Sequence, residues 1–267
     1  MKNKLFSTST LVLRRVLGGA VVASFVVVSA AALAVSDDFS DLDDTANPAW
    51  THLTGLANST GQSWDASTGN YRLKAPNNGI ILSGAQYGFV GSHVASTQLT
   101  DSYVSADFVV HTGNGLFGVY GVAARLDGAN GLNQLKGYGY AYEPFAAGLG
   151  GEMVLYRITG LGISDIGSQA VSLDPNKDYT FNLSITGSQL YGWVQEVGGP
   201  IVASKSAIDA TYASGSAGVF GYSANPVYAP TDFTIDNFSA VPEPSAIALA
   251  GLGLLGLFNA RRLNRSL

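Results

Sequence analysis

Apolar and polar residues alternate along most of this chain, in short runs that Gly, Asn, Asp and Ser interrupt. In the run Ser102–Val110, for example, Val104, Ala106, Phe108 and Val110 fall on one face, as expected for a half-buried strand. Runs of the same kind occupy Met153–Ile158, Tyr179–Ile185, Gln189–Gln195, Ala217–Tyr222 and Thr231–Ala240. No charged amphipathic helical stretch lies between them, so the pattern predicts an all-β domain.

Two further features indicate how these strands are arranged. The run Gly115–Leu126 is nearly continuously apolar, as in a strand that is buried on both faces. Turn sequences separate the runs, at Asp127-Gly128, Asp174-Pro175-Asn176 and Thr186-Gly187-Ser188. We therefore expect about a dozen strands in a two-sheet antiparallel β-sandwich, since stacking two sheets buries their apolar faces.

The first 34 residues have the pattern of a secretory signal peptide. A basic region is followed by the uncharged, mostly apolar run Val16–Ala34. Ala32 and Ala34 provide the two small residues that signal peptidase requires, which predicts cleavage after Ala34. An uncleaved signal anchor is the alternative, because the apolar run is longer than a typical signal core.

The last 27 residues form a second targeting segment. Pro242, Glu243 and Pro244 precede the uncharged stretch Ala246–Phe258, and a basic cluster that includes Arg261 and Arg262 follows it. As a helix the stretch would extend roughly 20 Å, against about 30 Å for a bilayer core. It forms a short transmembrane helix if its flanks assist, with the arginines reaching the headgroups. The alternative, an amphipathic helix docked on the domain, lacks a polar face.

This order of Pro-Glu-Pro, apolar stretch and basic residues resembles the PEP-CTERM sorting signal. The resemblance places Pro242, Glu243 and Pro244 on the motif and Arg261 and Arg262 on the basic stop. It implies an exported protein of a Gram-negative bacterium that makes extracellular polysaccharide. An inner-membrane exosortase would recognise the motif, so the protein would be anchored transiently in that membrane and then reach the cell surface or the medium.

Three segments follow from these features: a signal peptide at 1–34, a β-sandwich domain at 35–240 and a sorting signal at 241–267. The whole chain has 14 Lys and Arg; four lie in the signal peptide and three in the tail, which leaves seven against 18 acidic residues and a net charge of −11 for the domain. Nucleic acid is therefore not expected as a partner, because it requires a basic surface. The absence of cysteine excludes a disulfide framework and thiol chemistry.

The ends of the domain add a second resemblance. The domain opens with Asp37-Asp38-Phe39 and closes with Ile235-Asp236-Asn237-Phe238, and it contains the block YTFNLSITGSQLYGWV at 179–194. Together these resemble the concanavalin A-like lectin/glucanase jelly roll in its laminin-G-like variants. That resemblance implies that the first strand lies near the last and that the 179–194 block forms a hairpin. An unrelated β-sandwich is the alternative.

The resemblance raises the question of catalysis. Glucanases of this fold carry a Glu-x-Asp-x-Glu strand, since a retaining glycosidase needs two carboxyl groups about 5 Å apart. That motif is absent, and Glu143, Glu152 and Glu196 stand apart from one another in the sequence. The three histidines are also widely separated, and the sequence contains no nucleophile elbow. We therefore predict no catalytic residues and no enzyme.

Two aromatic patterns are candidates for carbohydrate binding, because sugar sites combine exposed ring faces with a few polar groups. Tyr138, Tyr140 and Tyr142 share one face of a predicted strand, and Tyr191 and Trp193 share a face of another. Glycines between or beside these rings would leave them accessible. The alternative is that both sets of rings pack in the core.

An acidic cluster at the start of the domain suggests a structural calcium site. Asp37 and Asp38 lead this cluster, and Asp236 belongs to the closing strand. Carboxylate oxygens on loops suit Ca²⁺. A solvated acidic N-terminus without metal is the alternative.

The sequence therefore predicts an exported surface or biofilm-matrix protein that holds extracellular polysaccharide on a lectin-like sandwich. Signal peptidase, exosortase and the inner membrane are its expected partners during export. The alternatives are a secreted glycan-degrading enzyme with untypical acids and a structural surface protein without a ligand.

Overall fold

The structure is a computed structural model. It describes residues 34–53, 61–75, 80–82, 85–87, 89–110, 118–127, 135–144, 150–160, 162–223 and 231–243. The predicted signal peptide up to residue 33 and the tail from Pro244 onward lie outside these ranges. Within them, no helix has the length and apolar character that a membrane crossing needs.

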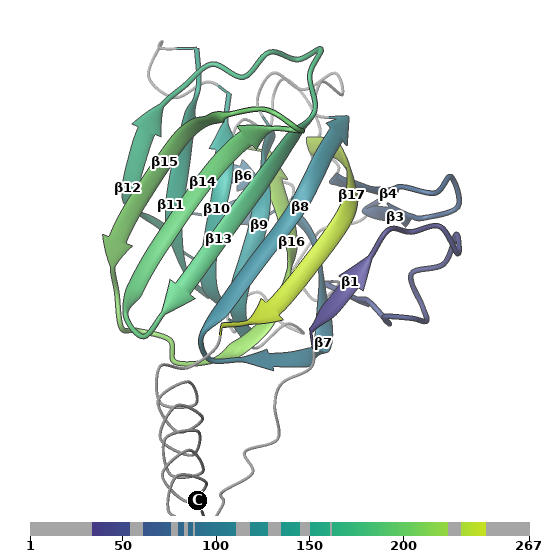
Figure 1. The fold of residues 1–267 in the computed structure, drawn as a ribbon, viewed down its shortest axis with the longest axis horizontal. Coiled ribbons are helices and arrows are strands. Elements are labelled where there is room, and N and C mark those ends of the chain that lie inside the picture. Colours follow the sequence, from purple (N-terminus) through teal and green to yellow (C-terminus); the bar gives the residue numbers. More distant parts are fainter. Residues whose placement is uncertain are drawn as a thin grey trace, which may run out of the picture. The chain divides into compact units, whose positions relative to one another are not determined.

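The strands form two stacked antiparallel sheets, which confirms the predicted β-sandwich (Figure 1). Sheet A contains, from edge to edge, β15 (Ile201–Ile208), β14 (Gln189–Glu196), β13 (Tyr179–Thr186), β8 (Ser102–Val110), β17 (Thr231–Pro242), β4 (Tyr71–Ala75) and β3 (Ser63–Asp65), with β1 (Val35–Asp37) paired to β17. Sheet B contains β12 (Gly162–Ala170), β11 (Glu152–Thr159), β10 (Lys136–Glu143), β9 (Gly118–Asp127), β16 (Gly215–Ser223), β7 (Phe89–Leu99) and β2 (Thr51–His52). A separate pair joins β5 (Ile80–Leu82) to β6 (Ala85–Tyr87).

Two pairings that the lectin-like resemblance implied are present. The 179–194 block forms the β13–β14 hairpin, in register from Tyr179↔Glu196 to Thr186↔Gln189. The first strand pairs with the last, with Asp37 opposite Phe238. The pairing of β1 with β17 brings the two ends of the domain together in sheet A.

The main core lies between the sheets and follows the period of two in each strand. Sheet B also buries its other face, where alternate residues form a second apolar cluster that includes Val119, Ala123, Ala141, Val154 and Phe220. Strand β9 is therefore buried along both faces, as its continuous apolar sequence predicted.

One glycine fixes how closely the two sheets approach. Gly192 lies on the inner face of β14, and a Cβ at this position would collide with the ring of Tyr140 on β10. The two sheets therefore meet here ring against backbone. Gly192 makes room for a core side chain, which corrects the expectation that it exposes the neighbouring rings.

Candidate functional site

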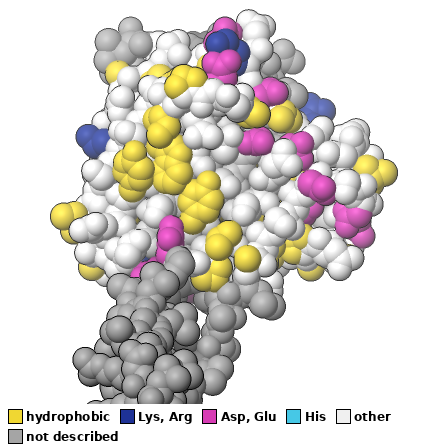
Figure 2. Space-filling view, viewed as in Figure 1, with side chains coloured by type: hydrophobic (Ala, Val, Ile, Leu, Met, Phe, Trp, Pro, Cys, Tyr) yellow, Lys and Arg dark blue, Asp and Glu magenta, His cyan; other side chains and the backbone are white. Residues whose placement is uncertain are grey.

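Three aromatic side chains form a row on the outer face of sheet A. Tyr103 of β8 and Trp193 of β14 stack with ring centroids 5.6 Å apart and planes inclined by 21°. Tyr191 of β14 stacks on Trp193 at 5.2 Å and 26°. We call Tyr103, Trp193 and Tyr191 the aromatic row. Figure 2 shows apolar side chains gathered on this face of the molecule.

The period of two determines why these rings face outward. Leu190, Gly192 and Val194 are buried against the other sheet, so Tyr191 and Trp193 between them must point to the opposite face. The stacking is offset, because centroids 5.2 and 5.6 Å apart in nearly parallel rings lie farther apart than in a direct face-to-face stack. Each ring therefore covers part of its neighbour and leaves the rest open, and Tyr191 is 42% exposed.

A buried asparagine holds the row in place. The Tyr103 hydroxyl donates to Oδ1 of Asn182 on β13, at 2.7 Å. The Asn182 amide donates to the carbonyl oxygens of Thr180 at 3.1 Å and of Trp193 at 3.3 Å. Asn182 is only 2% exposed, so its bonds hold the Tyr103 ring by its hydroxyl group and tie it to the backbone that carries Trp193. Preorganised rings lose little freedom when a ligand binds.

Polar groups and a shallow depression border the row. The register places Ser184 between Tyr103 and Tyr191, and Ser206 beyond Tyr191. Next to Tyr191 lies a depression of about 580 Å³, lined by Gln189, Leu190, Tyr191, Ser206, Ala207 and Ile208. Ring faces, hydroxyl groups and an open concavity occur together here, as in sites that bind sugars.

The other aromatic candidates belong to the core. Tyr138 and Tyr140 are fully buried and Tyr142 is 5% exposed, so their rings offer no face to a ligand. Two of the hydroxyl groups have structural partners: Tyr138 donates to Asp209 Oδ1 at 2.7 Å, and Tyr142 donates to the Gly150 carbonyl oxygen at 3.1 Å. Of the two interpretations that the sequence left open, the core interpretation therefore applies to these tyrosines.

The two fully buried tyrosines should respond differently to loss of the hydroxyl group. Tyr140 Oη has no hydrogen-bond partner among the described residues, so Tyr140→Phe should leave stability unchanged or raise it by about 1 kcal/mol. Tyr138→Phe should lower it by about 2 kcal/mol, since Asp209 and the Tyr212 amide lose their partner. Thermal melts of both variants test this, and equal shifts would contradict it.

The predicted calcium residues have other hydrogen-bond partners in the described part of the structure. Asp37 is buried and already accepts two hydrogen bonds, from the Phe39 amide at 2.8 Å and from Trp50 Nε1 at 2.7 Å. It therefore anchors the indole of Trp50 in the core, and burial raises the pKa of Asp37. Within the described ranges, no group of three or more His, Asp or Glu side chains is placed to hold a metal ion.

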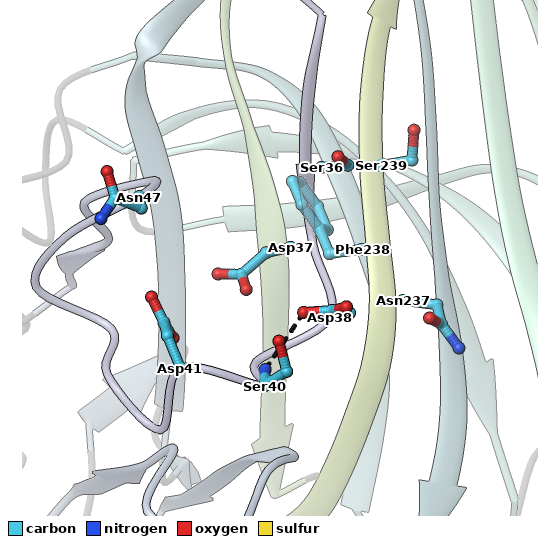
Figure 3. A pocket seen from close by; sticks show the side chains of 9 residues that line it. All are labelled: Ser36, Asp37, Asp38, Ser40, Asp41, Asn47, Asn237, Phe238 and Ser239. Atoms are coloured by element: carbon cyan, nitrogen blue, oxygen red, sulfur yellow. Dashed lines mark hydrogen bonds between the residues drawn. The ribbon is translucent and has the colours of Figure 1, made fainter.

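Asp37 and Asp38 nevertheless line a polar cleft of about 440 Å³ beside β1 and β17 (Figure 3). Asp38 accepts a hydrogen bond from the Ser40 amide at 3.1 Å, and hydrogen bonding to Ser40 lowers the pKa of Asp38. Asp236 is not among the lining residues. It lies opposite Asp107 in the β17–β8 register, and burial raises the pKa of Asp236, with further contributions from the charges of Asp107 and Asp38.

Sheet pairing also changes the picture of the glutamates. Glu143 and Glu152 are separated in the sequence, but the β10–β11 register places them directly opposite each other. Glu143 Oε2 accepts a hydrogen bond from the Tyr156 hydroxyl at 3.0 Å. Burial raises the pKa of Glu143, and the charges of Glu152 and Asp165 add to the effect.

The sorting motif begins inside the fold. Pro242 is the last residue of β17 and lies opposite Ser102, and Glu243 is the next described residue. Pro244, Arg261 and Arg262 lie outside the described residues.

Tyr103 is the site residue that the sequence did not single out. Along its strand, Tyr103 falls on the face opposite to the apolar residues. Its neighbours on that face are Ser and Asp residues, so it is the one aromatic ring there. Its partners are far away along the chain, with Asn182 79 positions downstream. An outward aromatic in a half-buried strand was the available signal.

Comparisons with known proteins agree with both parts of this description. The PEP-CTERM protein-sorting motif matches residues 240–263. Proteins with this motif are exported and sorted to the cell surface, and the motif implies processing by exosortase. No curated protein matches the chain.

Solved structures share the sandwich at low sequence identity. The CBM2 module of the evolved Dit protein of Lactobacillus casei BL23 phage J-1 is 10% identical, with a TM-score of 0.51 over 78% of this chain and 96% of its own. A Bacillus subtilis protein of unknown function with a galectin-like fold is 13% identical, with a TM-score of 0.50 and the same coverage. The carbohydrate-binding module CBM66 of Bacillus subtilis is 17% identical and reaches 0.47, over 70% and 92%. The chain thus combines a PEP-CTERM sorting motif with an all-β sandwich that is similar to those of a carbohydrate-binding module and of a protein with a galectin-like fold.

Proposed function

We propose that this protein is an exported cell-surface or matrix protein that holds polysaccharide on the aromatic row of sheet A. The observation that carries the proposal is the fixed, partly exposed stack of Tyr103, Trp193 and Tyr191. Planar rings pack against the CH-rich faces of pyranose units, and the serine hydroxyls beside them can bond sugar hydroxyls. Export through signal peptidase and exosortase would bring this surface to secreted glycans.

The charge of the surface favours an uncharged glycan. The positions beside the row carry the uncharged residues Ser105, Asn182, Ser184 and Ser206, and Ser184 donates a hydrogen bond to Glu243. The domain carries a net charge of −11 in total. A uronate-rich or sulfated polysaccharide would be repelled by this field. The proposed ligand is therefore a neutral polysaccharide.

The main prediction is that Trp193→Ala weakens binding without unfolding the domain. Trp193 contacts both other rings of the row, and one large apolar contact contributes about 1–3 kcal/mol. We expect the dissociation constant to rise roughly 5- to 150-fold. Affinity electrophoresis of the exported protein through gels containing neutral or acidic polysaccharides measures this change.

The control for this experiment is Leu42→Ala, which removes an exposed apolar side chain (55% exposed) from the loop after β1. It should bind as the unsubstituted protein does. Equal binding by the Trp193→Ala protein would contradict the proposal, and binding of acidic polysaccharides alone would contradict only the neutral-ligand part.

We also propose that the protein is a binder rather than a hydrolase. The rival function would use Glu143 and Glu152, since opposed residues on adjacent strands have Cβ atoms about 5 Å apart and a retaining glycosidase needs a similar carboxyl separation. Release of reducing sugar from a bound glycan, abolished in Glu143→Gln or Glu152→Gln, would establish the enzyme instead. A structural surface protein without a ligand would show neither binding nor release.

A further inference from the structure

The sorting motif starts within the last strand of the sandwich. Strand β17 pairs with β8 up to Pro242, with Val241 opposite Tyr103 and Pro242 opposite Ser102. One residue further, the Glu243 amide donates to the carbonyl oxygen of Asp101 at 3.0 Å. The first two residues of the Pro-Glu-Pro motif therefore continue the β-sheet pairing.

The side chain of Glu243 is also bound to the sandwich. Its Oε1 accepts a hydrogen bond from the Ser184 hydroxyl of β13 at 3.3 Å. Asp101, which binds the Glu243 amide, is held in turn: its Oδ1 accepts from the Gly187 amide at 2.8 Å and lies 3.5 Å from Nη2 of Arg125, which is 2% exposed. The motif is thus attached to a rigid turn and not only to a strand end.

This attachment conflicts with recognition by a membrane enzyme. An enzyme that recognises Pro-Glu-Pro needs access to the Glu243 side chain and to the Glu243 backbone amide. In the folded protein Ser184 and Asp101 already occupy those groups. We infer that the segment Val241–Glu243 must detach from sheet A before exosortase engages the motif, so that the rate of sorting depends on the fraction of molecules in which the end of β17 is open.

Opening the end of β17 needs much less free energy than unfolding the domain. Strand ends open locally far more readily than a whole domain unfolds. Beyond Ala240, which pairs with Val35, no residue of β1 pairs with β17, so the final residues pair with β8 alone. Detachment therefore breaks a few bonds and leaves the core in place.

The experiment separates folding of the precursor from its processing. The full chain is first accumulated in a host without exosortase, and the enzyme is then induced. A Gly-Ser-Gly-Ser insertion between Val241 and Pro242 frees the motif and keeps its distance from the apolar stretch. The inserted protein should be processed at least about fivefold faster, the change that one net hydrogen bond produces, as intact mass against time shows.

Two further variants complete the test. The same insertion in the turn Val197–Gly199 leaves β17 paired and should be processed at the original rate. Ser184→Ala removes only the carboxylate contact and should accelerate processing in the same direction by a smaller factor. Processing rates that are unchanged or lower in both the Val241 insertion and Ser184→Ala would overturn the inference. If the inserted protein fails to fold, an unchanged or lower rate in Ser184→Ala alone would overturn it.

Discussion

Gly192→Ala should destabilise the domain by about 3 kcal/mol, although it adds only one methyl group. The new Cβ would lie inside contact distance of Cδ2 and Cγ of Tyr140, and that ring is fully buried in the core between the sheets. For a domain of this size we expect the melting temperature to fall by roughly 6–12 °C. A thermal melt of the exported protein, followed by circular dichroism, measures the shift.

A double substitution identifies the cause of that loss. If Gly192→Ala acts through the ring of Tyr140, its effect should be smaller when Tyr140→Leu has already removed the ring. The two free-energy changes would then not be additive. Additive changes, or a melting temperature equal to that of the unsubstituted protein, would contradict the packing that we describe.

Two similar aromatic sequences in this chain show what an alternation of apolar and polar residues can predict and what it cannot. The sequences Tyr138-Gly-Tyr140 and Tyr191-Gly-Trp193 have the same pattern, yet the first pair is core and the second lies on the surface. Alternation predicts that two residues share a face, but what covers that face depends on the other sheet. Here sheet B covers the inner face of sheet A, and the outer face of sheet A carries the aromatic row.

Local features were the most predictable. The hairpin of β13 and β14 follows from two alternating runs around Thr186-Gly187-Ser188, and the structure has the same turn. The burial of β9 on both faces followed from its continuous apolar sequence. In both cases the determining residues are neighbours along the chain, so register and burial could be inferred without the rest of the fold.

Contacts between distant segments were not predictable in the same way. The sequence indicates Asp37 as a calcium ligand but gives no sign that its carboxylate accepts a hydrogen bond from the indole of Trp50. Glu143 and Glu152 were interpreted as isolated, but sheet pairing places them opposite each other. Carboxylates serve as ligands, acids or hydrogen-bond acceptors according to their partners, and those partners are defined only by the tertiary structure.

Asp209 should make a pH-dependent contribution to stability of about 2 kcal/mol near neutral pH. Its Oδ2 accepts from Arg157 Nη1 at 2.8 Å, and its Oδ1 accepts from the Tyr138 hydroxyl at 2.7 Å and from the Thr211 amide at 2.8 Å. Burial raises the pKa of Asp209, but hydrogen bonds from Thr211, Tyr138 and Arg157 outweigh it and lower the pKa from 3.8 to about 2. The difference from the unfolded chain gives the free energy.

The direction of the pH effect follows from that lowered pKa. The folded state holds Asp209 ionised more strongly than the unfolded state does, so the stabilisation is complete above about pH 4 and is lost as the pH falls towards 2. Asp209→Asn should therefore be less stable than the unsubstituted protein by about 2 kcal/mol at pH 7, and this difference should shrink towards pH 2. Urea unfolding at several pH values gives the free energy of unfolding of both proteins. In the difference between the two values, the contributions of the other carboxyl groups cancel. A difference that stays constant from pH 7 to pH 2 would show that the Asp209 carboxylate is not held by the hydrogen bonds of Arg157, Tyr138 and Thr211.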